Sequence, residues 1–290
     1  MSTASTDDYY VPHGTHWPII GSIGLTTTVV GFARYLHGAE LTMMFLGLAI
    51  VIFMMYGWFG QVIDESLSGL YNKQVDMSFR WGMGWFIFSE VMFFAAFFGA
   101  LFYARSFSIP WLGGASNNDA TAWLLWPDFE AAWPLISVPL AEKFEVAKHA
   151  MGAWGLPAIN TAILLVSGLT VTLAHHALKR RDRDWLVYWL AATVALGFLF
   201  VGLQALEYSH AYNDLNLRMD SGIYGSTFYM LTGFHGFHVT MGATMLLIIT
   251  IRAAKGHFTP ENHFAFEAVA WYWHFVDVVW LGLFVFVYWI

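Results

Sequence analysis

Long apolar stretches alternate with short polar segments along the chain, and this pattern predicts its secondary structure. Crossing a bilayer as a helix takes about 20 mostly apolar residues, at a rise of about 1.5 Å per residue. Seven stretches meet this requirement, at residues 17–36, 41–63, 79–104, 156–178, 186–208, 224–251 and 265–289. The pattern therefore predicts an all-α integral membrane protein with seven transmembrane helices.

The first two stretches are predicted to form a helical hairpin, because only the short link 36–40 separates them. Three consecutive threonines at 26–28 make the first stretch less apolar than the others, and a buried or re-entrant helix is the alternative there. The predicted parts, in order, are a cytoplasmic N-terminal segment, the two-helix hairpin, a cytoplasmic loop and a five-helix bundle. They cover residues 1–16, 17–63, 64–78 and 79–290.

The bundle contains one long polar loop, at about residues 105–155. The loop carries Trp111, Trp123, Trp126 and Trp133, and tryptophan prefers the headgroup region of a bilayer, so we expect the loop to lie on the membrane surface. Its segment AEKFEVAKHA (141–150) is predicted to form a short surface helix. Covering the interface and docking a partner are both open as roles for this loop.

Composition supports a membrane protein and excludes several functions. The chain is 58% hydrophobic and 11% charged, whereas soluble domains carry roughly 25% charged residues. Its net charge is −7 and it has no long basic tract, so nucleic acid is not an expected partner. Cysteine is absent, which excludes disulfides, thiolate-bound iron–sulfur clusters and copper sites built on cysteine.

Charged residues outside the stretches predict the orientation in the membrane. The N-terminus carries Asp7 and Asp8 where a cleavable signal peptide would be positively charged, so no signal peptide is expected. With the N-terminus in the cytoplasm, eight Lys and Arg residues fall on the inside and five on the outside. The turn KRRDR at 179–183 would be hard to translocate. These features favour a cytoplasmic N-terminus and an external C-terminus.

Glu90 is an ionisable residue deep inside a predicted span, about 11 residues from the start of the third stretch. A charged carboxylate near the centre of a bilayer costs at least about 2.5 kcal/mol. We therefore expect Glu90 to be protonated and hydrogen-bonded to a neighbouring helix. A direct role in proton transfer is the alternative.

The last stretch carries four polar residues spaced by 4, 7 and 3 positions, which places them on one stripe of a helix. They are His263, Glu267, His274 and Asp277. We expect this stripe to face other helices and not lipid.

Two histidines, His235 and His238, lie in the middle of the preceding stretch. His235 and His274 lie at similar depths, so two imidazoles on neighbouring helices are candidates for haem ligands. Hydrogen bonding between helices is the alternative use of such groups. We interpret them, together with Glu207 of the fifth stretch, as interhelical polar sites, and His175 at the end of the fourth stretch as an interfacial residue.

Five strings of the sequence resemble the cytochrome c oxidase subunit III family, and they occur in the family's order. They are GMGWFIFSEVMFFAAFF (82–98), LPAINTAILLVSGLTVTLAHHAL (156–178), QALEYSHA (204–211), DSGIYGSTFYMLTGFHGFHV (220–239) and AWYWHFVDVVWLGLFVFVYWI (270–290). The resemblance covers roughly 9–105 and 150–290, which leaves most of the long loop outside it.

The resemblance implies an accessory subunit of an aa3-type haem-copper terminal oxidase that reduces O2 to water and translocates protons. Such a subunit has no catalytic centre, haem, copper or other metal. Haem a, haem a3, copper A and copper B are expected in the partner subunits I and II. The first two helices splay from the other five and leave a lipid-filled cleft, and the subunit stabilises subunit I and supports its proton uptake.

The resemblance also implies residue roles. Phospholipid headgroups are held at the positions of Trp58 and Arg80, and Glu90 matches the family's buried glutamate. Gly60 and Gln61 stand where the family often carries a basic residue. A quinol oxidase subunit, and a stand-alone haem-binding or transport protein, are the alternatives. A bacterial plasma membrane is the expected location, with the mitochondrial inner membrane as the alternative, and the electron donor and the bound lipids are left open.

Overall fold

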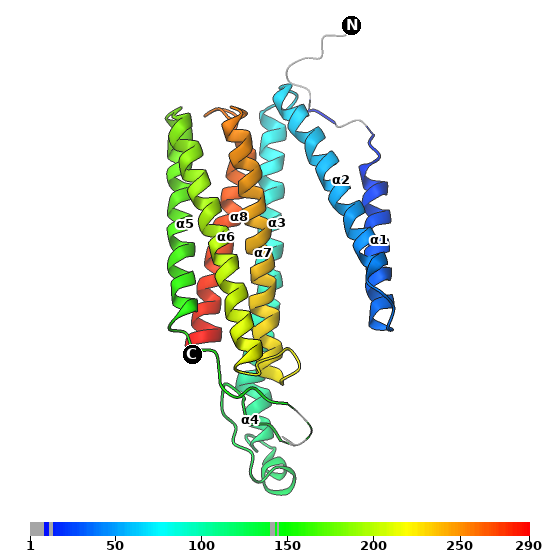
Figure 1. Cartoon of the computed structure of the whole chain (residues 1–290), viewed down its shortest axis with the longest axis vertical. Coiled ribbons are helices and arrows are strands. Elements are labelled where there is room, and N and C mark those ends of the chain that lie inside the picture. The colour runs from blue at the N-terminus through cyan, green and yellow to red at the C-terminus, as the bar shows by residue number, and fades with distance from the viewer. Residues whose placement is uncertain (1–8, 12–13, 140–142, 144) are drawn as a thin grey trace. The chain divides into compact units, whose positions relative to one another are not determined.

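A computed structural model describes residues 9–11, 14–139, 143 and 145–290. Within these residues the protein is helical and has no β-strand (Figure 1). Seven helical segments are long and apolar enough to cross a membrane. The predicted class, an all-α membrane protein with seven transmembrane helices, is confirmed.

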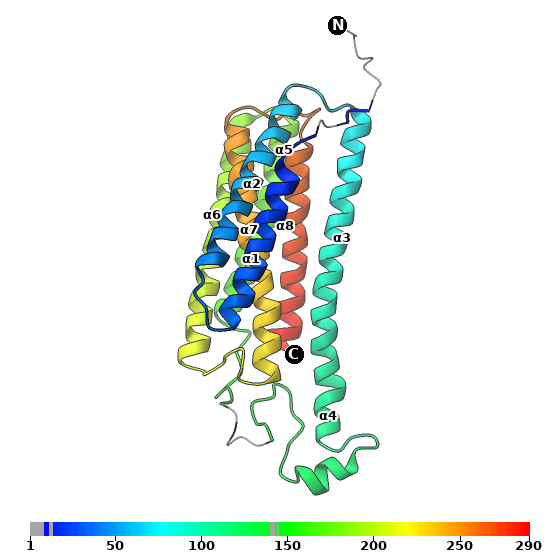
Figure 2. The same cartoon turned by 90° about the vertical axis from the view of Figure 1, so that its right-hand side faces the viewer.

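The long helices follow the predicted stretches closely. They are α1 (Trp17–Leu36), α2 (Thr42–Leu67), α3 (Lys73–Tyr103), α5 (Leu156–Lys179), α6 (Arg183–Asn213), α7 (Ile223–Ala254) and α8 (Phe264–Leu283). Figure 2 shows α3 continued by the short α4 (Ile109–Leu112), through the π-helical turn Ala104–Ser108. A second π-helical turn, Thr121–Leu125, lies in the long loop, and a third, Phe284–Trp289, extends α8.

Several helices extend beyond the apolar stretches that predicted them. α3 begins at Lys73, where the Asn72 side chain accepts hydrogen bonds from the backbone N–H groups of Gln74 and Val75, at 3.1 and 3.0 Å. Such a cap supplies partners for the first N–H groups of a helix. The apolar pattern marks only the part of a helix that lipid surrounds, so the polar ends of α3 are missed.

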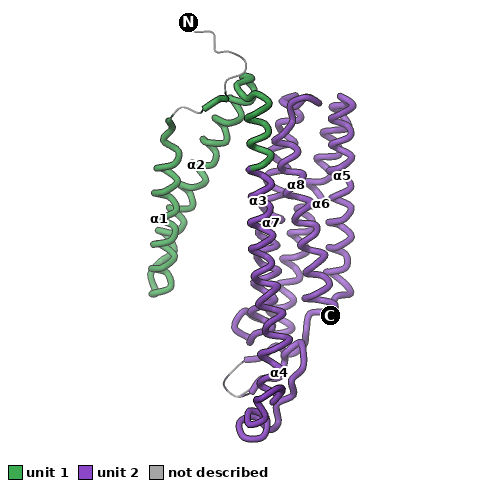
Figure 3. The backbone as a smooth tube through the Cα atoms, turned by 180° about the vertical axis from the view of Figure 1, so that it is seen from behind, with its two compact units in different colours: residues 1–81 green, residues 82–290 purple. Residues whose placement is uncertain are grey.

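The chain divides into two compact units, residues 1–81 and 82–290 (Figure 3). Unit 1 holds α1, α2 and the start of α3. Its hairpin is closely packed: a side chain at Gly31 would overlap the backbone at Met44, and one at Gly47 would overlap Thr28. Glycine at these two positions therefore lets the helix backbones approach each other.

Unit 2 is built around a core of large side chains from α5 to α8. Trp273 and Trp280 of α8 are almost completely buried. Each indole N–H finds an acceptor on α5, Ser167 Oγ for Trp273 and Thr161 Oγ1 for Trp280, both at 2.9 Å. Because buried polar groups need partners, these bonds fix the position of α8 against α5.

The long loop packs on one end of unit 2 through backbone hydrogen bonds. Lys148 N donates to Leu215 O at 2.8 Å, and the Asn216 side chain donates to Val146 O at 3.1 Å. The predicted helix at 141–150 is wrong for residues 145–150, which are not helical, and residues 141, 142 and 144 lie outside the described ones. Bonds to the α6–α7 connection replace the bonds that a local helix would make.

The KRRDR turn lies beside the α7–α8 connection. Arg181 Nη2 is 2.7 Å from Glu261 Oε1, and the Arg183 side chain donates to the carbonyl of Ala254. The pKa of Glu261 is lowered, first by a backbone hydrogen bond and then by Arg181. Both connections thus lie at the same end of unit 2, as the two helices between them, α6 and α7, require.

Candidate functional site

Glu90 of α3 and His238 of α7 form a pair inside unit 2. Glu90 Oε2 lies 3.0 Å from His238 Nε2, and the side chains are 22% and 9% exposed. His238 Nδ1 lies 2.6 Å from the carbonyl oxygen of Phe234, one turn earlier on α7. The predicted partner of Glu90 on a neighbouring helix is therefore a histidine.

The backbone contact determines where the protons of this pair lie. Because Nδ1 of His238 donates to the Phe234 carbonyl, a neutral imidazole has a lone pair at Nε2. The contact with Glu90 then needs one proton between Nε2 and Oε2, carried by the carboxyl in a neutral pair or by the imidazole in an ionic pair. A neutral pair avoids two charges in an apolar bundle.

Aromatic rings pack around the imidazole of this pair. Phe94 meets the His238 ring edge-on at a centroid distance of 5.1 Å, and Tyr272 of α8 stacks on it at 6.2 Å. Phe93 lies 6.0 Å away. These contacts surround the His238 ring, whereas the Glu90 side chain is 22% exposed.

His235 and His274, which were candidates for a haem site, contact different helices. His235 is almost fully buried, its Nε2 lies 3.2 Å from the carbonyl of Val276, and its ring packs on Trp280. The Nε2 of His274 lies 3.5 Å from Thr172 Oγ1 on α5. The structure therefore does not bring the two imidazoles together.

The prediction that the whole polar stripe of α8 faces other helices is wrong for His274, whose side chain is 47% exposed. Trp273 and Phe275, on either side of it, occupy the core instead. Asp277 is buried as predicted, 3.5 Å from His274 Nδ1 and against Gly168 of α5, where a larger residue would overlap its carboxylate.

The other predicted polar sites are also placed by the fold. Glu207 of α6 is buried and accepts a hydrogen bond of 2.7 Å from Tyr288 Oη. Glu267 lies beside His263, the residue directly before α8, and beside His175 of α5. His175 is predicted from the sequence only as an interfacial residue, because no pattern within one helix shows which residues of another helix approach it.

Trp58 lines a cavity of about 200 Å³ inside unit 1. The other lining residues are Tyr9, Tyr10, Thr15, Gln61, Val62, Glu65, Tyr71, Val75 and Phe79. Its polar side is a chain of hydrogen bonds around Glu65, which accepts from Tyr71 Oη at 2.7 Å and from Gln61 Nε2 at 2.9 Å. Burial and this contact with Glu65 raise the pKa of Tyr71, so its phenol stays protonated and donating.

Arg80, the second predicted lipid residue, does not line this cavity. Its Nε donates to Asp76 Oδ2 at 2.7 Å, one turn earlier on α3, and both side chains are more than a third exposed. Unit 1 thus holds Trp58 in an aromatic cavity beside Glu65, and Arg80 in a partly exposed ion pair.

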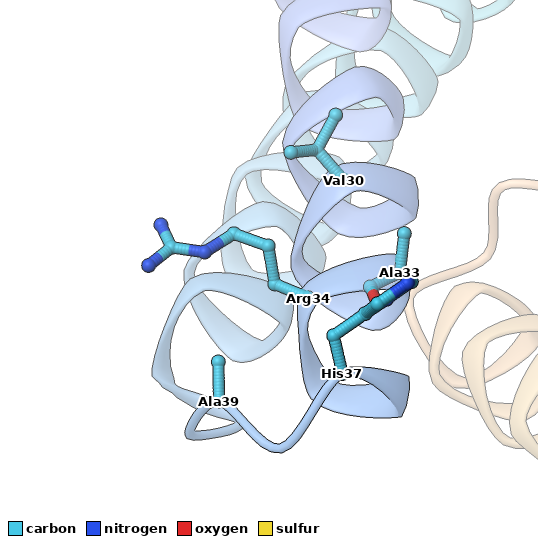
Figure 4. Close-up of a pocket in the computed structure, with 5 residues that line it drawn as sticks. All are labelled: Val30, Ala33, Arg34, His37 and Ala39. Carbon is cyan, nitrogen blue, oxygen red and sulfur yellow. The ribbon is translucent and has the colours of Figure 1, made fainter.

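A second hollow lies at the turn between α1 and α2, lined by Val30, Ala33, Arg34, His37 and Ala39. Figure 4 shows the guanidinium of Arg34 pointing away from the ring of His37. His37 Nδ1 lies 2.8 Å from the carbonyl oxygen of Ala33. The two polar side chains do not converge, so this hollow has no set of groups for a specific ligand.

Comparison with known proteins identifies the family. The family model described as cytochrome c oxidase subunit III matches residues 7–116 and 125–290. Cytochrome c oxidase subunit 3 of Carassius auratus is 40% identical over 282 residues, covering 97% of this chain and 96% of that protein. That of Drosophila melanogaster is 40% identical over 290 residues, covering 100% and 99%. That of Marchantia polymorpha is 40% identical over 292 residues, covering 100% and 98%. This chain belongs to the cytochrome c oxidase subunit III family.

Membership in the subunit III family confirms the resemblance on which the sequence prediction rests. It makes the chain part of a membrane-bound oxidoreductase complex of aerobic respiration. The relatives carry the name of cytochrome c oxidase, so a quinol oxidase is not favoured as its complex.

The subunit III family model also covers most of the long loop and leaves only residues 117–124 unmatched. The expectation that the loop falls outside the family is therefore wrong. Several of its contacts with the bundle run through backbone atoms, such as Lys148 N and Leu215 O. Backbone contacts constrain side-chain identity little, so the loop has no long sequence motif by which the family can be recognised.

Proposed function

We propose that this chain is an accessory subunit of cytochrome c oxidase that holds no haem or copper. In this proposal it binds subunits I and II, stabilises subunit I, retains phospholipid and supports proton uptake. The oxidase chemistry, with haem a, haem a3, copper A and copper B, takes place in the partner subunits. The observation that carries the proposal is the use of the two buried imidazoles of α7 inside the bundle: His235 bonds to a backbone carbonyl and His238 to Glu90.

If this chain holds no haem, substituting the histidines that were candidates for a haem site should not change the haem content of the complex. His274→Ala and His235→Asn, made in the complete oxidase, should leave the visible spectrum and the haem content unchanged. Asparagine keeps a donor near the Val276 carbonyl and so limits the damage to packing. Loss of about one haem per complex with either variant would contradict the proposal, because two axial histidines serve one iron.

The proposed partners are tested by purification. A tag on this chain should isolate subunits I and II in equal amounts, together with phospholipid. Recovery of this chain without subunit I, from membranes that contain an active oxidase, would contradict the proposed association.

Lipid binding is proposed for Trp58 and Arg80. The guanidinium fork of Arg80 matches a phosphate in geometry and charge, and its exposure leaves it accessible from the membrane. Trp58 lines the aromatic cavity and is 41% exposed, and an indole ring suits the interface between headgroups and acyl chains.

We further propose a bacterial plasma membrane with a cytoplasmic N-terminus and an external C-terminus. The chain has no cysteine, so single cysteines report without background. Arg180→Cys should react with a membrane-impermeant thiol reagent only from the cytoplasmic side, and Asn117→Cys only from outside. Both positions are exposed. The reverse labelling pattern would invert the proposed orientation.

A further inference from the structure

Three metal-ligating side chains from two elements converge in unit 2. They are His175, near the end of α5, His263, directly before α8, and Glu267, in the first turn of α8. His175 Nε2 lies 3.2 Å from His263 Nε2 and 3.6 Å from Glu267 Oε1, and the third side of the triangle, from His263 Nε2 to Glu267 Oε1, is 3.3 Å. From this geometry we propose that the cluster is a zinc site that clamps α5 to the start of α8.

The size of the triangle matches tetrahedral zinc. Zinc binds imidazole nitrogen and carboxylate oxygen at about 2.0–2.2 Å, so two ligand atoms of a tetrahedral site lie about 3.3–3.5 Å apart. The three distances between the atoms of the cluster, 3.2, 3.3 and 3.6 Å, fall around that range. An ion pair between a carboxylate and an imidazolium is typically shorter, at about 2.7–2.9 Å.

Neighbouring groups orient two of the three ligands. His263 Nδ1 lies 3.0 Å from the carbonyl oxygen of Thr259, to which it donates, and this places the lone pair of a neutral ring on Nε2. A backbone carbonyl behind the second nitrogen is the usual support of a metal-bound histidine. The ring of His175 packs on Phe266 at a centroid distance of 5.3 Å, which limits its rotation.

The donor set selects the class of metal. Calcium and magnesium prefer sites made of oxygen ligands, whereas two imidazoles and one carboxylate suit zinc and other divalent transition metals. Two histidines and a glutamate with a fourth position for water are a known zinc arrangement. The three side chains are 26, 8 and 14% exposed, so His175 leaves a path for the ion and a water molecule.

The proposed zinc site differs from the expectation that this chain holds no metal. It adds no redox centre, because zinc does not change oxidation state. Its position joins residues 88 apart in the chain, at the end of unit 2 where the KRRDR turn meets the α7–α8 connection. The inference rests on the distances within this chain and does not depend on the proposed roles in lipid binding or proton uptake.

The test measures zinc in the purified oxidase complex. The complex is stripped with a chelator, dialysed against micromolar Zn²⁺ with excess Mg²⁺ and Ca²⁺, gel-filtered and analysed for metals by mass spectrometry. Wild type should hold about one more zinc per complex than His175→Ala or Glu267→Gln. Because partner subunits can hold zinc of their own, only the difference between variants counts.

His176→Ala is the matched control, since it removes an exposed histidine next to His175 and should keep the zinc. Glutamine has almost the shape of glutamate, so a loss of zinc in Glu267→Gln cannot be attributed to misfolding. Zinc should also raise the temperature at which this subunit leaves the complex, in wild type and His176→Ala only. Equal zinc content in wild type and in both ligand variants would overturn the site. A loss of zinc in His176→Ala as large as in the ligand variants would overturn it too. A ferrous or cupric ion retained in place of zinc would overturn the assignment of the metal.

Discussion

Glu90→Ala is expected to destabilise the attachment of this subunit to the oxidase, whereas Glu90→Gln is expected to preserve it. Alanine leaves a cavity between α3 and α7 and removes the partner of His238 Nε2. A buried polar group without a partner costs about 1–3 kcal/mol, and the lost packing adds to this. Glutamine keeps the size of the side chain and an N–H donor for the lone pair of His238, so its cost should be less than about 1 kcal/mol. The measurement is the fraction of complexes that retain this subunit as detergent concentration or temperature rises.

The same pair of variants tests whether the proton of Glu90 takes part in uptake. Glutamine cannot release a proton, yet we expect the Glu90→Gln complex to take up and pump protons at nearly the wild-type rate with this subunit still bound. The reason is that phenylalanine rings pack around His238, the hydrogen-bond partner of this carboxyl, and such rings cannot carry a proton onward. A large fall in proton uptake by the intact Glu90→Gln complex would show that the titration of this carboxyl matters. His238→Ala serves as the reciprocal variant and should resemble Glu90→Ala in retention, because it leaves the carboxyl without its partner.

Arg80→Ala is expected to reduce the tightly bound phospholipid of the purified complex by about one molecule. A charge-assisted hydrogen bond contributes about 1.5–3 kcal/mol, so lipid affinity at the site should fall by about 10- to 100-fold. Arg80→Lys keeps the charge but not the planar fork and should lie in between. Phospholipid phosphorus per complex, after repeated detergent exchange, is the measurement.

Two further variants make the lipid test specific. Arg34→Ala removes an exposed arginine at the opposite end of the hairpin helices, in the hollow of Figure 4, and should leave the lipid content unchanged. Asp76→Asn removes the anion that pairs with Arg80 and should strengthen lipid retention, because a phosphate no longer competes with a carboxylate. Unchanged lipid in Arg80→Ala would indicate that Arg80 only extends to the interface and pairs with Asp76.

The hydrophobic pattern was sufficient to determine the fold class and the helices of this protein. Backbone groups in a bilayer have no water to bond with, so an apolar stretch of sufficient length must become a helix whatever surrounds it. α1 accordingly covers Trp17–Leu36, the residues that the pattern predicts, and the strings around Glu90 and His235 were enough to indicate the family. Helical periodicity also showed that Asp277 faces the interior.

Tertiary structure alone decided which polar groups meet. Glu90 and His238 are 148 residues apart, and His175 and His263 are 88 apart, so no local spacing relates them. A helix pattern fixes the face on which a residue lies, but the rotation of each helix and the identity of its neighbours follow from packing of side chains such as Trp273 and Trp280. For this reason the sequence placed His274 inside the bundle and His175 at its edge, whereas packing exposed the first and made the second part of a three-ligand cluster.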